Sequence, residues 1–145
     1  MKSVKLILMM AFAAISFSAM AQVNYDDPKY AKWGANAEQR KQNMLNRQYL
    51  GEAVDNRQLN VAAGYLKILL DKCPAASLNI YTDGAKLYKL KINSTEDEKQ
   101  KAIYIDSLLY IYDVRLANYA DHSKYGADYI LDRKVREMLN YRPEA

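Results

Sequence analysis

The chain has 145 residues, with 21 Lys and Arg, 17 Asp and Glu, one His and one Cys. A single Cys excludes an internal disulfide bond, and a single His beside a single Cys argues against a zinc site within one chain. The net charge of +4 is too small to demand nucleic acid as a partner, and the length suffices for one modest core.

Residues 1–21 have the three parts of a secretory signal peptide. A short end with two lysines precedes an apolar stretch over residues 6–17, and residues 19–21 (Ala-Met-Ala) supply a small-residue cleavage site. The apolar stretch is shorter than the roughly 20 residues that cross a bilayer, which favours a signal over a membrane anchor. We predict cleavage between Ala21 and Gln22, which gives a periplasmic or secreted protein with no integral membrane span in the mature chain.

Cleavage would change the composition. Both phenylalanines and two lysines would be removed, which leaves all thirteen tyrosines, one tryptophan and a net charge of +2 from 19 basic and 17 acidic residues. Tyr and Trp have apolar bodies and polar tips, which suits a thin fold in which few positions are fully buried.

Residues 22–35 are polar, and Asp26-Asp27-Pro28 favours an extended N-terminal segment. We expect Tyr30 and Trp33 to fold back onto the first helix rather than to bind a sugar. The aspartates lack the alternating oxygen ligands and the glycine turn of a calcium loop, so they are interpreted as solvated linker.

Residues 36–145 show apolar spacings of three and four, which predict a domain of about five antiparallel helices. The expected apolar faces are Met44, Leu45, Tyr49 and Ala53; Leu59, Ala62, Ala63, Leu66, Leu69 and Leu70; Ile80, Tyr81, Gly84, Ala85, Leu87, Tyr88 and Ile92; Ile105, Leu108, Leu109, Tyr112, Leu116 and Tyr119; and Ala127, Ile130, Leu131, Val135, Met138 and Leu139. No stretch alternates with period two, so no sheet is expected. Some helices are apolar on more than one side, which a stacked array would explain, although a compact bundle is an alternative.

Local signals mark several helix ends. Asn56 is a candidate N-cap for the second helix, and Thr95 with Glu98 forms a candidate capping box for the fourth. Cys73-Pro74 closes the second helix, and apolar neighbours favour a buried thiol over one that pairs with another chain.

The residue types of catalysis and metal binding are present but poorly arranged. Asp121-His122-Ser123 resembles a hydrolase triad only in composition, because adjacent residues cannot form the relay, so we interpret it as a loop. The acidic run Glu96–Glu98 suits a helix start. There is no P-loop or glycine-rich nucleotide fingerprint. We therefore predict no catalytic, cofactor-binding or metal-ligating residues and no enzymatic activity, with a carboxylate site assembled by folding as the weaker alternative.

Two basic groups remain: Lys86, Lys89 and Lys91, and Arg133, Lys134 and Arg136. Basic residues beside aromatic ones can hold nucleic acid. The small net charge instead favours lysines that face solvent, and we predict no nucleic-acid partner.

The helix spacing matches parts of the tetratricopeptide pattern, a 34-residue helix pair. Ala62-x3-Leu66 followed by Pro74 fits the second half of one repeat, and Gly84-x2-Leu87 fits the start of the next. Small residues at these positions would let the paired helices approach closely. Leu50 stands where the first repeat has glycine, and about a dozen residues near 91–101 are inserted.

The order of short segments along the chain strengthens this match. They are Asp27–Gly34, Ala53–Arg57, Lys72–Ser77, Asn79–Tyr81, Asp106–Leu108, Tyr112–Asp113 and Tyr129–Lys134. The chain resembles the amino-terminal region of exported tetratricopeptide-repeat-like proteins common in Bacteroidetes, which continue with further repeats. The resemblance implies a right-handed α-solenoid and a scaffold for protein–protein interaction, with no catalytic residue to transfer. We expect a protein or peptide partner in the cell envelope, and self-association into a structural component as the alternative.

Overall fold

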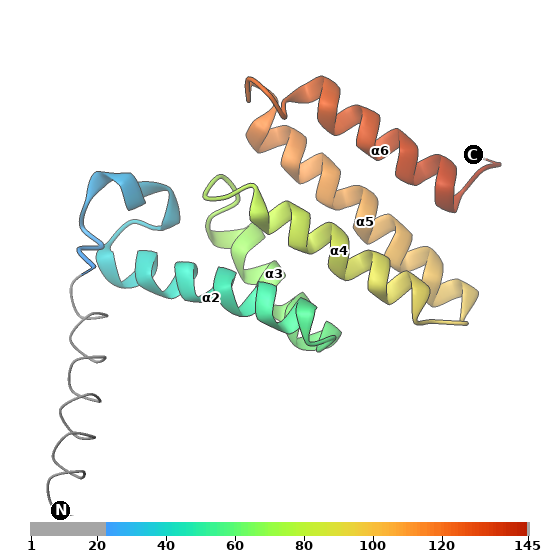
Figure 1. The fold of residues 1–145 in the computed structure, drawn as a ribbon, viewed down its shortest axis with the longest axis horizontal. Helices are drawn as coiled ribbons and strands as arrows, with labels where there is room; N and C mark the ends of the chain where they lie inside the picture. Colours follow the sequence, from blue (N-terminus) through green and yellow to red (C-terminus); the bar gives the residue numbers. More distant parts are fainter. Residues whose placement is uncertain (1–22, 145) are drawn as a thin grey trace, which may run out of the picture.

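Every regular element among residues 23–144, which the computed structural model describes, is a helix. The elements are a 3-10 helix, η1 (Pro28–Trp33), and the α-helices α2 (Ala37–Asp55), α3 (Leu59–Lys72), α4 (Asn79–Asn93), α5 (Glu98–Tyr119) and α6 (Ala127–Tyr141) (Figure 1). This confirms the all-α class, with an α-helix at each of the five expected places. The predicted signal peptide lies outside the described residues. None of the described helices combines the length and the apolarity that a membrane crossing requires.

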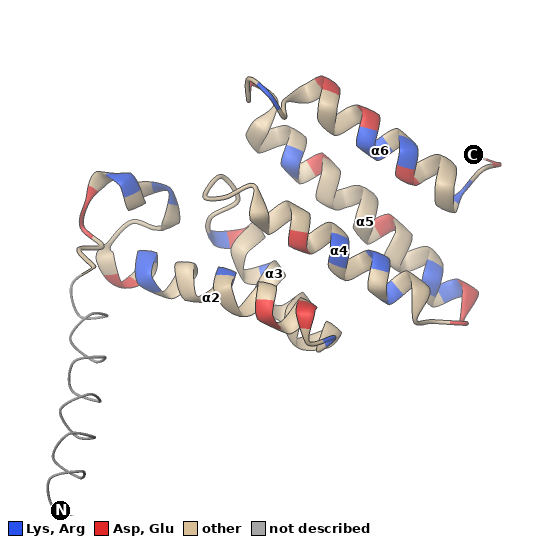
Figure 2. Cartoon of the chain, viewed as in Figure 1, with Lys and Arg blue, Asp and Glu red and all other residues tan. Residues whose placement is uncertain are grey.

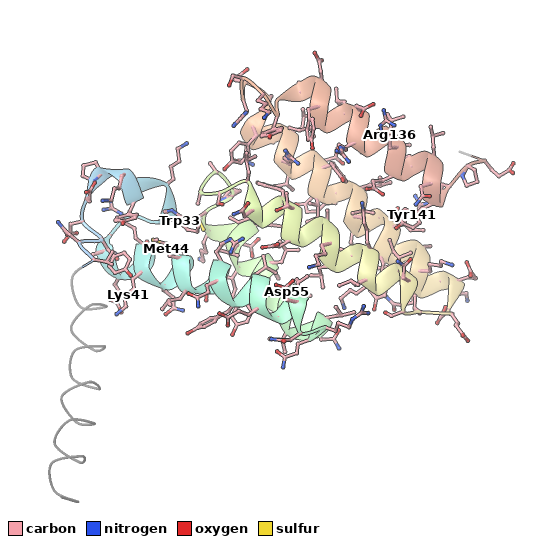
Figure 3. All side chains as sticks on the ribbon, in the orientation of Figure 1. Trp33, Lys41, Met44, Asp55, Arg136 and Tyr141 are labelled. Atoms are coloured by element: carbon pink, nitrogen blue, oxygen red, sulfur yellow. The ribbon has the colours of Figure 1, made fainter. Side chains whose placement is uncertain are left out.

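The segment before α2 differs from the extended conformation expected for residues 22–35. Pro28 has the fixed φ that suits a first helical residue, and residues 28–33 form a 3-10 helix. Trp33, labelled in Figure 3, packs against the hydrophobic core, and its carbonyl oxygen accepts a hydrogen bond from Asn43 Nδ2 of α2 (2.7 Å). The expected return of Trp33 to the first helix is confirmed.

Consecutive helices pack against each other from α2 to α6, and α4 also contacts α2. Figure 1 shows α4, α5 and α6 side by side with alternating direction. Two ion pairs join α2 to α4, because Arg47 donates to Asp83 (2.9 Å) and Lys86 donates to Asp55 (2.6 Å). Each interior helix therefore has neighbours on more than one side, which explains its broad apolar face.

Helix α4 comes close to α3 at Gly84. A methyl group at this position would lie 3.1 and 3.2 Å from the two methyl carbons of Leu66 and 3.4 Å from Cδ1 of Ile111. Leu66 is only 2% exposed, so it already fills the available space. The small residue expected at Gly84 thus permits the short separation of the two helices.

The core consists of two hydrophobic clusters. The first joins α2, α3, α4 and one residue of α5, and its fully buried members include Leu50, Leu69, Ile80, Tyr81 and Leu87. The second joins α4, α5 and α6 through Ile92, Ile105, Leu108, Tyr112 and Ile130. Cys73 belongs to the first cluster and is 3% exposed, which confirms its predicted burial. Burial raises the pKa of the Cys73 thiol to about 11.

Two tyrosines hold the connection between α3 and α4. Tyr81 donates its hydroxyl to the carbonyl oxygen of Pro74 (2.7 Å), and Tyr119 of α5 donates to that of Ala75 (2.9 Å). Their rings meet edge to face with centroids 5.7 Å apart. Because Tyr combines an apolar ring with a polar tip, it can pack in the core and still bond a loop carbonyl.

Two expected helix caps are wrong. Helix α5 begins after Asp97, whose carboxylate accepts hydrogen bonds from the backbone N–H groups of Lys99 and Gln100 (2.9 and 3.2 Å). A charged carboxylate is a stronger acceptor at a helix start than the hydroxyl of Thr95, so the Thr95–Glu98 box does not form. Asn56 ends α2 and does not cap α3, which begins without a side-chain cap.

The buried faces of α2 and α6 also differ from expectation. Leu131, Val135 and Leu139 of α6 are 44%, 51% and 59% exposed, and α6 buries Ile130 and Glu137 against α5. In α2, Tyr49 is likewise exposed. The apolar side chains of α6 therefore form two faces, of which only one meets α5.

Candidate ligand-binding groove

A hollow with a volume of about 710 Å³ lies between α3 and α5. Leu66 and Leu70 of α3 line it on one side, and Ile103 and Tyr110 of α5 line it on the other. The α5 residues are unusually open for apolar side chains, with 56% of Ile103 and 60% of Tyr110 exposed. Exposed apolar side chains that lie together on a surface often mark a contact site.

A second groove, of about 330 Å³, is formed by α4, α5 and α6 and is strongly basic. Lys86 and Lys89 of α4, Arg115 of α5 and Arg133 of α6 line it, together with several tyrosines. Figure 2 shows basic residues on all three of these helices. The fold thus brings together members of the two basic groups that lie over forty residues apart in the sequence. We refer to this hollow as the basic groove.

Lys91 does not face solvent as expected for its group. It is 7% exposed, and its Nζ donates to Oδ1 of Asn60 in α3 (2.9 Å) while lying 5.0 Å from the ring centroid of Tyr104 in α5. Burial lowers the pKa of the Lys91 ammonium group. This lysine therefore joins three helices and lies outside the basic groove.

Arg115 is the buried cation of the basic groove. It is 7% exposed, and its Nε atom is buried without a hydrogen-bond partner among residues 23–144. No carboxylate in that range forms an ion pair with it. An unpaired charge that is removed from water is costly, so such a group needs a specific explanation.

A second guanidinium group approaches the same aromatic ring. The guanidinium carbons of Arg115 and Arg133 lie 5.3 and 5.2 Å from the ring centroid of Tyr129. The ring attracts each cation through its quadrupole, which accounts for part of the arrangement. Within the described part of the chain Arg133 also forms no ion pair, so two arginines place uncompensated positive charge around Tyr129.

The acidic residue that faces this region is already paired. Glu137 of α6 is 8% exposed, forms an ion pair with Lys89 of α4 and accepts a hydrogen bond from the Tyr112 hydroxyl (3.3 Å). Burial, reinforced by the charge of Glu137, raises the pKa of Tyr112 to about 12, so its hydroxyl keeps the proton. Glu137 therefore compensates Lys89, and no other carboxylate of residues 23–144 pairs with Arg115 or Arg133.

The remaining basic residues of the second group form ion pairs outside the arginine cluster. Lys134 pairs with Asp113 of α5 (2.5 Å), and Arg136 pairs with Asp132 one turn before it on α6 (2.8 Å). Figure 3 labels Arg136 on α6, where 71% of its side chain is exposed. Because both side chains are neutralised by a carboxylate, they do not extend the positive charge of the basic groove along α6.

Asp121-His122-Ser123 lies in the loop between α5 and α6, as predicted. His122 Nδ1 accepts hydrogen bonds from the backbone N–H groups of Lys124 and Tyr125 (3.2 and 3.1 Å). No hydrogen bond joins its ring to Asp121 or Ser123 among residues 23–144. In the same range, no three His, Cys, Asp or Glu side chains cluster in a way that could hold a metal ion.

Arg115 is the groove residue that the sequence analysis missed. It follows Leu108, Ile111 and Tyr112 by seven, four and three residues, which are the spacings of one helix face. All three of those residues are buried. A charge at an inward position was therefore a usable signal, because a charged side chain seldom occupies such a position without a partner.

Comparison with protein-family models, with curated proteins and with solved structures finds no match to this chain.

Proposed function

We propose that this protein is an exported, non-enzymatic scaffold of the tetratricopeptide type that binds a protein or peptide partner in the cell envelope. The contact of α2 with both α3 and α4 supports this proposal, because a repeat array requires each helix pair to pack on the next. The close approach of Gly84 and Leu66 supports it as well, since this glycine stands at a small-residue position of the repeat pattern.

The observation that carries the binding role is the open groove between α3 and α5. Ile103 and Tyr110 expose more than half of their side chains beside a hollow of about 710 Å³. Tyr is enriched at protein interfaces, because its rigid ring buries a large area at low entropic cost. A partner that covered this groove would remove exposed apolar surface from water, which favours association.

The non-enzymatic part of the proposal rests on what the reactive residue types do. His122 orders the loop between α5 and α6 through its acceptor nitrogen. Cys73 is buried, and its raised pKa keeps the thiol protonated, whereas a nucleophilic cysteine needs an accessible thiolate. Both residues therefore have structural roles.

Site-specific photo-crosslinking in the producing cells tests the proposal. A photoreactive phenylalanine analogue replaces Tyr110 in the α3–α5 groove or Arg133 in the basic groove, with Gln48 on the exposed side of α2 as the control. A scaffold gives a discrete protein adduct from at least one groove position and none from Gln48. If neither groove position gives a discrete protein adduct, the binding role is refuted.

Self-assembly is a second candidate, favoured by the outer face of α6. Leu131, Val135 and Leu139 follow one another at four-residue spacing, so they form an exposed apolar stripe on the last described helix. An uncovered end of a helical array tends to associate. Sedimentation velocity of wild type and of the Val135→Glu and Leu139→Glu variants tests this: self-assembly predicts association that rises with concentration and is lost in both variants. A monomer at all concentrations would eliminate this candidate.

A further inference from the structure

The basic groove contains one buried cation, Arg115, that has no carboxylate partner among residues 23–144. Arg115 is more than nine-tenths buried with an unpartnered Nε, and it shares the Tyr129 ring with a second arginine. Other bases of the array have a partner: Arg47 and Lys89 each pair with a carboxylate, and the buried Lys91 donates to the amide of Asn60. Among residues 23–144, Arg115 forms neither an ion pair nor a hydrogen bond to an amide.

We propose that the basic groove binds an acidic side chain, Asp or Glu, from an extended segment of a partner protein. Arg115 is the central contact, and Arg133 is the second. The inference deepens the proposed scaffold function and rests on it, because it states the chemistry by which a partner is recognised.

The geometry of arginine explains why a carboxylate fits. A guanidinium group presents its N–H donors in a planar fork that matches the two oxygens of a carboxylate, and such charge-assisted bonds are stronger than neutral ones. Arg115 itself is 7% exposed, and the buried Tyr81 and Tyr112 form part of the lining around it. A carboxylate that entered here would therefore meet a donor that has already lost most of its hydration.

The size of the groove indicates an extended segment. Its volume of about 330 Å³ lies at the lower end of the roughly 300–1,000 Å³ that small-ligand sites occupy. One or two side chains of an extended peptide fit such a space, whereas an intact helix with side chains is about 10 Å wide. The charged residue would enter the groove, and its neighbours would contact α4 and α6 outside it.

The charge distribution argues against nucleic acid as the occupant. Nucleic acid requires a track of unpaired basic residues along its phosphates. Here Lys86, Lys134 and Arg136, which lie around the arginine pair on α4 and α6, each have a carboxylate partner within 2.8 Å. Around the groove, the unpaired positive charge is thus limited to the two arginines, which suits a single carboxylate.

The Nε–H resonance of Arg115 in a ¹⁵N-labelled sample reports binding directly. The full chain is expressed, and the exported form is titrated with acetylated and amidated tetraglutamate, with the matching tetraglutamine peptide and with inorganic phosphate. We expect tetraglutamate to shift the Arg115 Nε–H resonance and the amides of α4, α5 and α6 that surround the groove. Tetraglutamine should leave them unchanged.

Variants identify the contact. Arg115→Met keeps the length and the apolar stem of the side chain, and it should weaken tetraglutamate binding at least tenfold. Arg115→Lys keeps the charge but loses the fork, so it should bind with intermediate affinity and show that charge alone is insufficient. Arg136→Gln, on the same helix as Arg133 but paired with Asp132, should bind as wild type. Circular dichroism confirms that each variant is folded.

Three results would overturn the inference: an Arg115 resonance that tetraglutamate does not move, equal binding of tetraglutamine, or phosphate binding that is as tight as that of tetraglutamate. The scaffold function is tested separately. A protein adduct from Tyr110 combined with a silent Arg115 resonance would retain the scaffold and reject the acidic segment. Tetraglutamate binding without any protein adduct would show a carboxylate site in the groove and reject the scaffold, and with it the partner protein as the source of the carboxylate.

Discussion

The contact between Gly84 and Leu66 gives a quantitative test of how α3 and α4 pack. The test compares Gly84→Ala with Gly64→Ala, the same substitution in α3 at an exposed position where an added methyl group would meet nothing within 4 Å. Replacing glycine by alanine inside a helix stabilises it by roughly 0.5–1 kcal/mol, because the unfolded chain loses freedom and the helix gains propensity. Gly64→Ala should show this gain.

At Gly84 the same gain meets a steric cost. The new methyl group would lie 3.1 and 3.2 Å from the methyl carbons of Leu66, which is closer than carbon atoms pack at their optimum of roughly 3.5–4.0 Å. Forcing an extra methyl group into a filled core costs roughly 1–3 kcal/mol. We therefore expect Gly84→Ala to be less stable than Gly64→Ala by roughly 1–3 kcal/mol, since the helix gain cancels between the two variants.

Urea unfolding followed by circular dichroism measures both free energies of unfolding. A double-mutant cycle shows whether the contact with Leu66 causes the difference. Leu66→Ala alone should lower the free energy of unfolding by roughly 2–5 kcal/mol. The same substitution should cost less in the Gly84→Ala background, where the new methyl group fills part of the cavity. Equal stabilisation by Gly84→Ala and Gly64→Ala would refute the close approach of α3 and α4.

Other residues give further tests. The Cys73 thiol, with its pKa raised to about 11 by burial, should react with a thiol reagent at pH 8 only as fast as the protein opens, and rapid reaction of the whole population in native buffer would contradict its burial. The pKa of Tyr112 is raised to about 12, so between pH 10 and 12 the unfolded chain loses this proton before the folded protein does. The free energy of unfolding should therefore be unaffected by this group below pH 10 and should fall above pH 10 by roughly 1–3 kcal/mol. Urea unfolding at pH 9 and pH 11 measures this fall, which should be smaller in Tyr112→Phe. Tyr81→Phe removes the donor to the part-buried carbonyl oxygen of Pro74 and should cost roughly 0.5–1.5 kcal/mol, whereas a loss below the error of the urea midpoint would show that this hydrogen bond is not needed.

The positions of the helices were predictable because their signals are local. Leu66, Leu69 and Leu87 repeat with helical spacing and are buried as predicted, and Pro74 limits α3 because proline disfavours helical geometry in the residue before it. The cap predicted at Asn56 failed because that residue ends α2, and α3 begins without a side-chain cap. The cap predicted at Thr95 failed because another acceptor lies two residues later. Asp97 provides the stronger acceptor, and the sequence offers no measure of that competition.

The assignment of buried faces could not be made from spacing alone. Helix α6 has Leu131, Val135 and Leu139 at one set of helical positions, with Ile130 and Glu137 at another. Only the packing of α6 against its neighbouring helices decides which set is buried. The buried set includes a carboxylate, because Glu137 forms an ion pair with Lys89 of α4. The same limitation concealed the basic groove, whose cations come from three helices and converge only after folding.

The proposed function of this protein is to bind a partner on its helical array. Hydrogen–deuterium exchange tests this function. It is measured for the exported protein alone and with the partner found by crosslinking. Amide exchange slows where binding suppresses local opening. The scaffold with an acidic-segment site predicts slower exchange in α4 and α6 and in α5 around Arg115, and a loss of that protection in Arg115→Met. Unchanged exchange in all helices, or protection confined to η1 and α2, would contradict it.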